Sequence, residues 1–226
     1  MNGRTPPARR PAEGREALVR APRTQAERRQ HTRQALMDAA LLQIEAGESF
    51  ERLSLRSVAR AAGVVPTAFY RHFQSMDELG LALVEESFRT LRAMLRQARE
   101  GLPPEHIIHR SVEILVDRVR AHRQHFLFVI RVGSTGNTVL RHAIRNEIRL
   151  FTSELATDLA RFPVLREWTT EDLQMLAGML VNTMIATVGA MLDAPVAGPQ
   201  SEIEIARVAE KQLRLAMLAT PHWHSS

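Results

Sequence analysis

A run of side chains near residue 70 has the chemistry of a surface that binds nucleic acid. The run consists of Thr67, Ala68, Tyr70, Arg71 and His72. Hydroxyl and guanidinium groups can hydrogen-bond to base edges or phosphate oxygens, and a methyl group can contact thymine. Pro66 precedes the run, and proline suits the first position of a helix because its missing N–H costs nothing there. We therefore expect a short helix that presents these groups to a DNA groove.

The residues before this run predict a helix-turn-helix, in which two short helices meet at a sharp turn. Ala59 is small where the helices would cross closely, and Gly63, four residues later, tolerates the positive φ that the turn requires. The side chains of Val58, Val64 and Phe69 can fill the space between the helices. An ordinary hairpin of two helices can have the same turn, so this spacing alone leaves that alternative open.

The positive charge of the chain is concentrated at its N-terminal end. Residues 1–33 contain nine arginines and three glutamates, a net charge of +6, whereas all 226 residues sum to +5. The remainder of the chain is therefore slightly acidic, at −1. A basic arm beside a nearly neutral body suits an anionic polymer such as double-stranded DNA. A tail that only keeps the protein soluble is the alternative.

Further side chains near the arm and the turn can contribute DNA contacts. Three arginines can reach phosphates or a neighbouring minor groove: Arg23, Arg28 and Arg29. Arg56, near the start of the first short helix, can pair with guanine or phosphate. Ser54 is placed first to cap that helix and second to contact a phosphate. For an isolated arginine, Arg71 included, a solvated surface position is the competing interpretation.

Composition and periodicity favour an all-α fold. Aromatic residues make up only 5% of the chain, helix-forming residues abound, and no segment has a credible strand pattern. Thr24 and Gly47 suit the start and end of a first helix, and capping boxes begin at Ser75 and Thr169. Nine helices are predicted, at residues 24–46, 54–62, 66–73, 75–100, 104–121, 123–132, 137–161, 169–193 and 201–219. Loops are expected at 133–136 and 194–200.

These elements divide the chain into four parts. Residues 1–23 lack helical periodicity and are expected to be a disordered basic arm. Residues 24–75 are expected to form the N-terminal three-helix DNA-binding domain, and residues 76–220 a larger helical domain that binds a ligand and dimerises. Residues 221–226 are a short tail.

Residues 30–90 resemble the DNA-binding domain of TetR-type transcription regulators. The matching segments are Leu55-Arg-Ser-Val-Ala-Arg-Ala-Ala-Gly-Val64 and Phe69-Tyr-Arg-His-Phe73. The resemblance implies an all-helical homodimer that regulates transcription, and it places Tyr70 and His72 at positions that hydrogen-bond phosphates. Many members have a lysine near the start of the fourth helix, where this chain has Gln74, Ser75 and Met76.

Within that family, residues 66–80 are similar to repressors of fatty-acid synthesis and desaturation genes. Residues 91–99, 131–136 and 145–156 resemble the same subgroup more weakly. The resemblance implies a long-chain acyl-CoA as effector, with Arg131 as a candidate partner of its polar head. The alternative is a TetR-type repressor of an efflux or catabolic operon that senses another hydrophobic small molecule. A helical protein-interaction module that binds no DNA is a third possibility.

Large or flexible apolar side chains are frequent between residues 79 and 192, as in a tunnel that can repack around a long chain. The candidates are Phe88, Met94, Phe126, Phe128, Phe151, Met175, Met179 and Met184. For any one of them, ordinary core packing is the competing interpretation. No cofactor is expected besides the effector.

The last two predicted helices are the expected dimer surface. One is almost uncharged and the other has an apolar stripe, so with their symmetry mates they would form a four-helix bundle. Small residues that permit close approach are Ala177, Gly178, Ala186, Gly189 and Ala190. A two-fold dimer would place two recognition helices roughly 34 Å apart on a palindromic operator. Burial within one subunit explains part of the same face.

Other classes of function find little support in the sequence. The chain has no cysteine, no Gly-rich phosphate loop and no Gly-x-Ser-x-Gly motif, so an enzyme is not expected. His106 and His109, like His122 and His125, have a zinc-compatible spacing, but no carboxylate pattern accompanies them and no metal is expected. Residues 173–192 are long enough to span a membrane, but polar residues interrupt them, which favours a buried central helix in a cytoplasmic protein.

Overall fold

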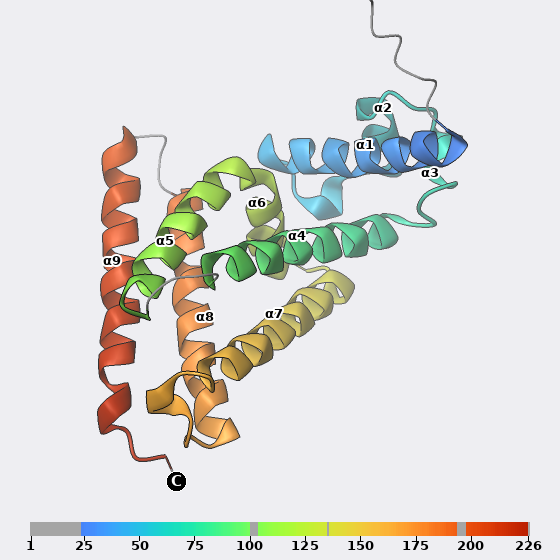
Figure 1. The fold of residues 1–226 in the computed structure, drawn as a ribbon. Coiled ribbons are helices and arrows are strands. Elements are labelled where there is room, and N and C mark those ends of the chain that lie inside the picture. Colours follow the sequence, from blue (N-terminus) through green and yellow to red (C-terminus); the bar gives the residue numbers. More distant parts are fainter. Residues whose placement is uncertain (1–23, 100–103, 135, 194–197, 226) are drawn as a thin grey trace, which may run out of the picture.

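The computed structural model describes residues 24–99, 104–134, 136–193 and 198–225. Over these residues the chain is helical and contains no strand, so the predicted all-α class is confirmed (Figure 1). The nine α-helices are α1 (Gln25–Glu45), α2 (Leu55–Ala61), α3 (Pro66–Phe69), α4 (Met76–Arg99), α5 (Pro104–Ala121), α6 (Arg123–Gly133), α7 (Thr138–Leu159), α8 (Thr170–Asp193) and α9 (Gly198–Leu218). Three short 3-10 helices accompany them: η1 (Phe50–Arg52), η2 (Pro163–Leu165) and η3 (Thr220–His222).

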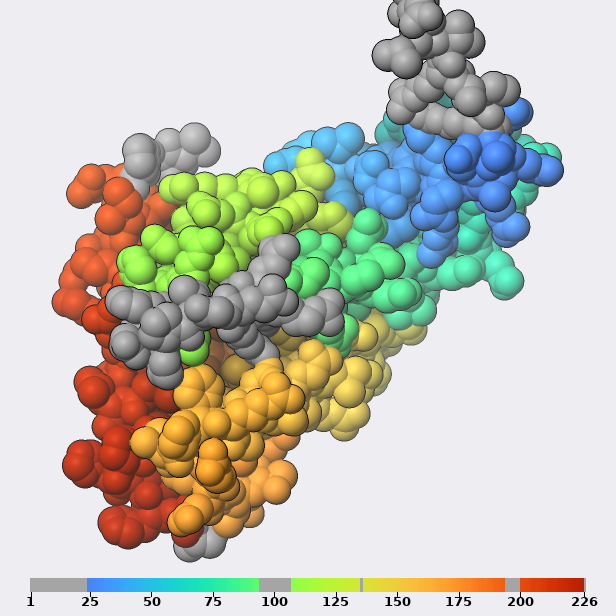
Figure 2. Space-filling model, viewed as in Figure 1, coloured from blue at the N-terminus to red at the C-terminus, as the bar shows by residue number. Residues whose placement is uncertain are grey.

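The helices gather at two ends of an elongated molecule. α1, α2 and α3 lie together at one end, and α5, α8 and α9 lie toward the other (Figures 1 and 2). α4 runs from the first group into the second, α7 packs against α4 and α8, and α6 packs against α1. The helices near residue 70 are therefore carried on a larger helical body.

Side-chain caps fix the starts of three long helices. The Thr24 hydroxyl accepts from the Glu27 N–H (3.2 Å), and the Glu27 carboxylate accepts from the Thr24 N–H (2.7 Å). The Ser75 hydroxyl accepts from the Glu78 N–H (3.1 Å), and the hydroxyl of Thr169 caps α8 in the same way. These hydroxyls satisfy backbone donors that have no partner within the helix. The capping role predicted for each of the three residues is confirmed.

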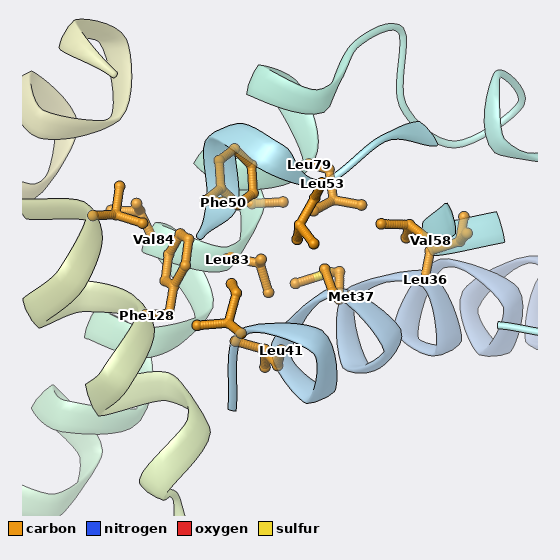
Figure 3. Close-up of a cluster of buried hydrophobic side chains, with 14 of the residues drawn as sticks. Leu36, Met37, Leu41, Phe50, Leu53, Val58, Leu79, Leu83, Val84 and Phe128 are labelled. Carbon is orange, nitrogen blue, oxygen red and sulfur yellow. The ribbon is translucent and has the colours of Figure 1, made fainter. Parts of the chain in front are cut away.

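One hydrophobic core joins the N-terminal helices to the body, and Figure 3 shows part of it. Its fully buried residues include Leu36 of α1, Leu83 of α4 and Leu140 of α7. The rings of Phe50 and Phe128 meet edge to face within it, with centroids 5.8 Å apart. We call this cluster the junction core. Because it crosses the boundary predicted at residue 75, α1–α3 are fixed to the body by shared apolar contacts.

α8 is central to a second core in the body. Leu173, Leu176 and Ala177 on one face of α8 are buried, whereas Met175 and Met179 are 44% and 51% exposed. α8 is also the one described helix that is long and apolar enough to cross a membrane. Its inner face packs against α5, α7 and α9 residues, which accounts for much of that apolar composition, as predicted for a central helix.

The structure differs from the predicted element bounds at several helix ends, and three of these differences concern the recognition helix and the two predicted loops. α3 ends at Phe69 instead of Phe73, because the N–H groups of Arg71 and His72 donate to carbonyls three residues back, as in turns. α9 begins at Gly198, inside the predicted loop at 194–200, and the proline that follows is tolerated in a first helical turn. α6 continues through Gly133, into the predicted loop at 133–136. The predicted arm, residues 1–23, lies outside the described residues.

The C-terminal residues lie against the start of α8. The Ser225 hydroxyl accepts from the Thr169 N–H (2.8 Å) and donates to the Asp172 carboxylate (2.5 Å). The rings of Trp168 and Trp223 are tilted by 42° relative to each other, with centroids 6.3 Å apart. We call this contact the C-terminal clasp. It includes residues 223 and 225 of the segment that the sequence predicted as a tail.

Candidate DNA-binding surface and ligand cavity

α2 and α3 meet at a turn whose geometry depends on Gly63. Gly63 has a φ of +69°, which L side chains rarely adopt. Across the turn, the Val64 N–H donates to the Ala59 carbonyl (2.9 Å). At the other end of α2 the Ser54 hydroxyl accepts from the Ser57 N–H (3.1 Å). The predicted turn at Gly63 and the predicted cap at Ser54 are therefore confirmed.

Buried side chains orient α3, which is only four residues long. Phe69 is fully buried, and its ring lies 5.6 Å from that of Phe73. Val58 and Ala59 of α2 are fully buried as well, and Val64 packs against the junction core. Val58, Val64 and Phe69 are the residues that the sequence predicted to fill the space between the two helices. Since a single turn of helix has little stability of its own, this packing must hold α3 in place.

The opposite side of α3 is accessible. Its exposed residues are Pro66, Thr67, Tyr70 and Arg71, and Arg56 of α2 is also exposed. Ala68 and His72 are half-buried. Tyr70 is 64% exposed, although its ring meets the buried ring of Phe69 edge to face, with centroids 6.1 Å apart. The surface thus offers a hydroxyl group on α3, a phenol and a guanidinium in the turn that follows it, and a second guanidinium on α2, all of which can contact base edges and phosphates.

Guanidinium groups surround the end of this surface. Burial lowers the pKa of the His72 imidazole, and Arg29, Arg33 and Arg71 lower it further by charge repulsion. The Arg33 guanidinium lies 4.4 Å from the centre of the Phe73 ring, and its Nη1 donates to the His72 carbonyl (3.5 Å). The lowered pKa favours the neutral imidazole of His72, which lies in a strongly positive environment that suits an anionic partner. The sequence did not single out Arg33, because its contacts with residues 72 and 73 depend on the fold.

Two other predicted arginines lie on α1. Arg28 and Arg29 are exposed in its first turns, on the helix that also carries Arg33. Arg23 lies outside the described residues. The DNA contacts of all these side chains stay predictions, while the exposure of Arg28 and Arg29 follows from the structure.

A second candidate site is an apolar cavity of about 270 Å³ in the body. Side chains of α4, α5, α6, α7 and α8 line it. Four residues that the sequence singled out are part of the lining: Phe88, Phe126, Phe151 and Met184. The others are Leu91, Ser111, Ile114, Leu115, Val129, Ile130, Gly133, Ser134, Ile144, Arg145, Ile148, Val181, Ile185 and Val188. The wall is thus mainly aliphatic. Ile144 and Ile148 of α7 are branched residues at helical spacing, and this spacing is the sequence signal for such aliphatic wall residues.

The remaining residues predicted to contact a ligand lie elsewhere. Phe128 is fully buried in the junction core. The Arg131 guanidinium donates to the Ile44 carbonyl at the end of α1 (2.6 Å). Met175 and Met179 are on the exposed face of α8, and the side chain of Met94 lies outside the described ones. Phe128, Arg131, Met175 and Met179 are thus not part of the described cavity lining.

α6 connects the cavity to the DNA-binding end. Phe126 and Ile130 line the cavity, and Phe128, on another face, belongs to the junction core. Besides the bond from Arg131 to Ile44, the Gln124 amide donates to the Glu45 carboxylate (2.7 Å). α6 therefore holds the C-terminal end of α1 by two side-chain hydrogen bonds. A change in the cavity that shifts α6 must also act on α1.

An apolar face on α8 and α9 is left uncovered within one chain. Its exposed residues include Met175 and Met179 of α8 and Ile203, Val208, Leu215 and Leu218 of α9. Of the small residues predicted at a dimer interface, Ala177 is fully buried inside the subunit, while Ala186 and Ala190 are exposed. An uncovered apolar face of this kind is typical of an interface with another molecule.

Two of the histidines with a zinc-compatible spacing, His109 and His125, have hydrogen-bond partners within the protein. The Ser87 hydroxyl donates to the Leu83 carbonyl (2.8 Å), so it accepts from Nδ1 of His125 (3.0 Å). Burial lowers the pKa of His125. A hydrogen bond to Glu210 raises the pKa of His109. Among the described residues no three His, Asp or Glu side chains converge as metal ligands would.

Comparisons with known proteins agree with this arrangement. Residues 36–83 match the family model described as bacterial regulatory proteins, tetR family. Residues 104–219 match the model described as tetracyclin repressor-like, C-terminal domain. Together the two matches include the turn, the recognition surface and most of the helical body.

Solved structures with the same fold include three that concern ligands or regulation. The fatty acid degradation regulator FadR of Bacillus halodurans superposes with a TM-score of 0.67 and is 17% identical, covering 82% of this chain and 94% of its own. FadR of Bacillus subtilis in complex with stearoyl-CoA gives 0.65 at 14% identity, covering 81% and 96%. The SmeT–triclosan complex gives 0.62 at 20% identity, covering 83% and 90%. At these identities the likeness establishes the fold.

Proposed function

This chain belongs to the TetR family of ligand-responsive transcriptional regulators, which are DNA-binding proteins and not enzymes, and from that premise we propose that it is a dimeric repressor controlled by a hydrophobic effector. The observation that carries the proposal is the outward orientation of α3. Thr67 and Tyr70 are exposed while Phe69 anchors the same turn of helix. On this proposal two copies of α3 enter successive major grooves of a palindromic operator in the cytoplasm.

The apolar face on α8 and α9 supports the dimeric part of the proposal. Paired across a two-fold axis, the four helices would bury Met175, Met179 and Leu215, which are exposed in one chain. Burial of these side chains would supply the association energy, and the axis would set the spacing of the two recognition helices.

We propose a long-chain acyl-CoA as effector and fatty-acid synthesis or desaturation genes as targets. The aliphatic lining of the cavity supports this, and two of the structural relatives are named FadR, one solved with stearoyl-CoA. At about 270 Å³ the cavity is near the lower end of ligand pockets, so a long chain requires the wall to open. Met184 and the phenylalanines of the wall can do so by changing rotamers.

An efflux or catabolic repressor is the second candidate, favoured by the compact cavity and by the relative solved with triclosan. Mass spectrometry of small molecules that co-purify with the native protein distinguishes the two. Acyl thioesters favour the first candidate, and an aromatic or other compact compound favours the second. The neighbouring gene is an independent criterion: a desaturase or fatty-acid synthesis gene favours the first candidate, and a pump gene favours the second.

DNA binding is tested by gel-shift titration of the protein against its own promoter at several salt concentrations. Affinity is expected to fall linearly with salt on logarithmic axes, because phosphate contacts release counterions. Tyr70→Phe removes the phenol hydroxyl that would donate to a phosphate, so we expect about tenfold weaker binding to every DNA sequence. Thr67→Val should instead change the preference between operator variants. A flat salt response, with both variants silent, would contradict the proposed placement of the recognition helix.

The effector would act by shifting the population of two DNA-binding geometries. A ligand that displaces α6 moves the end of α1 through Arg131 and Gln124. A tenfold change in operator affinity requires about 1.4 kcal/mol of coupling. A hydrogen bond from a charged group, at about 1.5–3 kcal/mol, is large enough to transmit it.

Arg131→Gln is therefore expected to uncouple the two sites. The ratio of operator dissociation constants with and without effector should approach one, while effector affinity stays within about twofold of the native value. The measurement is a fluorescence-anisotropy titration of labelled operator with and without saturating effector. Arg149→Gln, on the exposed side of α7, is the matched control and should keep the native ratio. An Arg131 variant with unchanged ratio would show that coupling follows another route.

A further inference from the structure

The cavity has a wall of apolar side chains with one formal charge among its described lining residues. That charge is Arg145 of α7, which lies between Ile144 and Ile148 in the sequence and lines the cavity with them. Two serines, Ser111 and Ser134, are the other polar side chains of the lining. Arg145 is exposed to solvent, so this lining residue lies where water can reach the cavity.

Arg145 has no hydrogen-bond or ion-pair partner among the described residues, unlike the charged groups around it. Arg92 of α4 holds both nearby carboxylates of α7, with Nη2 2.7 Å from Glu147 and Nε 3.1 Å from Glu154. Arg149, one turn further along α7, donates to the Asn146 amide oxygen (2.8 Å). Glu147 and Glu154 of α7 are thus engaged by Arg92, and Arg145 has no acidic partner among the described side chains.

The described lining contains no acidic group that would repel an anion, and the hydroxyl hydrogen of Ser134 is already donated within the chain. The Ser134 hydroxyl donates to backbone carbonyls of α6, those of Ile130 and Arg131. No carboxylate is part of the described lining. A guanidinium presents a planar fork of N–H donors that fits a carboxylate or phosphate in bidentate geometry.

We propose that Arg145 makes this cavity selective for amphipathic organic anions, with the apolar part in the cavity and the anionic head on the guanidinium. This inference rests on the proposed role of the cavity as the effector site. An uncharged molecule of the same shape gains the apolar burial but not the charge-assisted hydrogen bonds. The head is a free carboxylate or a phosphate of a larger carrier, and both have the chemistry that Arg145 recognises. Arg131, which the sequence suggested for this role, is held instead by the end of α1.

Three twelve-carbon probes test the inference by isothermal titration calorimetry: dodecanoate, dodecanol and dodecanoyl-CoA, each below its micelle concentration. For the native protein, at least one of the two anions should bind ten or more times tighter than the alcohol. Arg145→Gln should reduce that preference to twofold or less and leave the alcohol's affinity unchanged. Arg149→Gln should keep the native preference. Tight binding of the acid alone identifies a carboxylate head, and tight binding of the thioester alone identifies a phosphate head.

A further variant separates the inference from the function on which it rests. Ile148→Trp places a large ring in the cavity and should abolish binding of all three probes. If the native protein binds acid, thioester and alcohol equally, or if Arg145→Gln keeps the preference, selectivity by Arg145 is wrong while the effector cavity stands. If no probe binds the native protein, or if Ile148→Trp binds them all as tightly, the cavity is not the binding site and both proposals are overturned.

Discussion

Replacing Phe69 with alanine is expected to lower the free energy of unfolding by about 3–5 kcal/mol, as for other fully buried phenylalanines. Phe69 is wholly inaccessible to solvent and joins the four-residue α3 to the junction core. The same substitution should abolish specific operator binding, since nothing else of comparable size anchors the short helix. Urea denaturation at one fixed protein concentration measures the first effect, because dimerisation would make the stability depend on concentration.

The neighbouring residue supplies the control. Tyr70 is 64% exposed, so Tyr70→Phe should leave the urea midpoint unchanged while weakening operator binding. The two adjacent positions would then separate folding from recognition. A Phe69→Ala variant that is as stable as the native protein and still binds its operator would show that α3 is not held by this side chain.

Gly80→Ala is expected to destabilise the fold by about 1–3 kcal/mol, although alanine is the better helix former. Gly80 lies in α4, where a side chain would meet residues of the junction core. A Cβ at this position would be 2.6 Å from Cδ1 of Leu140 and 2.8 Å from Cζ of Phe50. Both neighbours are buried, so they cannot move aside without disturbing the packing of α4 against α7 and η1.

A double-mutant cycle tests this steric explanation. Leu140→Ala alone should cost about 2–5 kcal/mol by leaving a cavity. In the background of Leu140→Ala, Gly80→Ala should lower the free energy of unfolding by clearly less than it does in the native background. The reason is that the added methyl group enters the space that Leu140 has vacated. The measurement is again the urea midpoint and slope of the four proteins. Strictly additive losses would mean that the strain at Gly80 arises from something other than contact with Leu140.

The helix-turn-helix could be predicted from the sequence because its determinants are local. The cap at Ser54, the positive φ of Gly63 and the anchoring by Phe69 each follow from a residue type and its neighbours in the chain. The length of α3 could not be predicted in this way. The sequence from Phe69 to Phe73 continues a helical spacing, but residues 70–72 form turns and the rings of Phe69 and Phe73 pack on one core.

The cavity was harder to predict because α6 is apolar on more than one side. Phe126 and Phe128 are two residues apart and of one type, yet the first lines the cavity and the second is buried against Phe50. Arg131 and Arg145 are equally alike in the sequence, and long-range packing alone assigns one to the end of α1 and the other to the cavity. Distinctions of this kind depend on which helices become neighbours.

The aromatic chromophores are divided between two distant parts of the molecule. The chain has one tyrosine, Tyr70 on the recognition helix, and two tryptophans, which meet in the C-terminal clasp. Figure 1 places α3 and the C-terminus at opposite ends. Ultraviolet emission of the unlabelled protein therefore contains two separate signals. Tyrosine emission reports on the surface that would meet the operator, and tryptophan emission reports on the far end of the body.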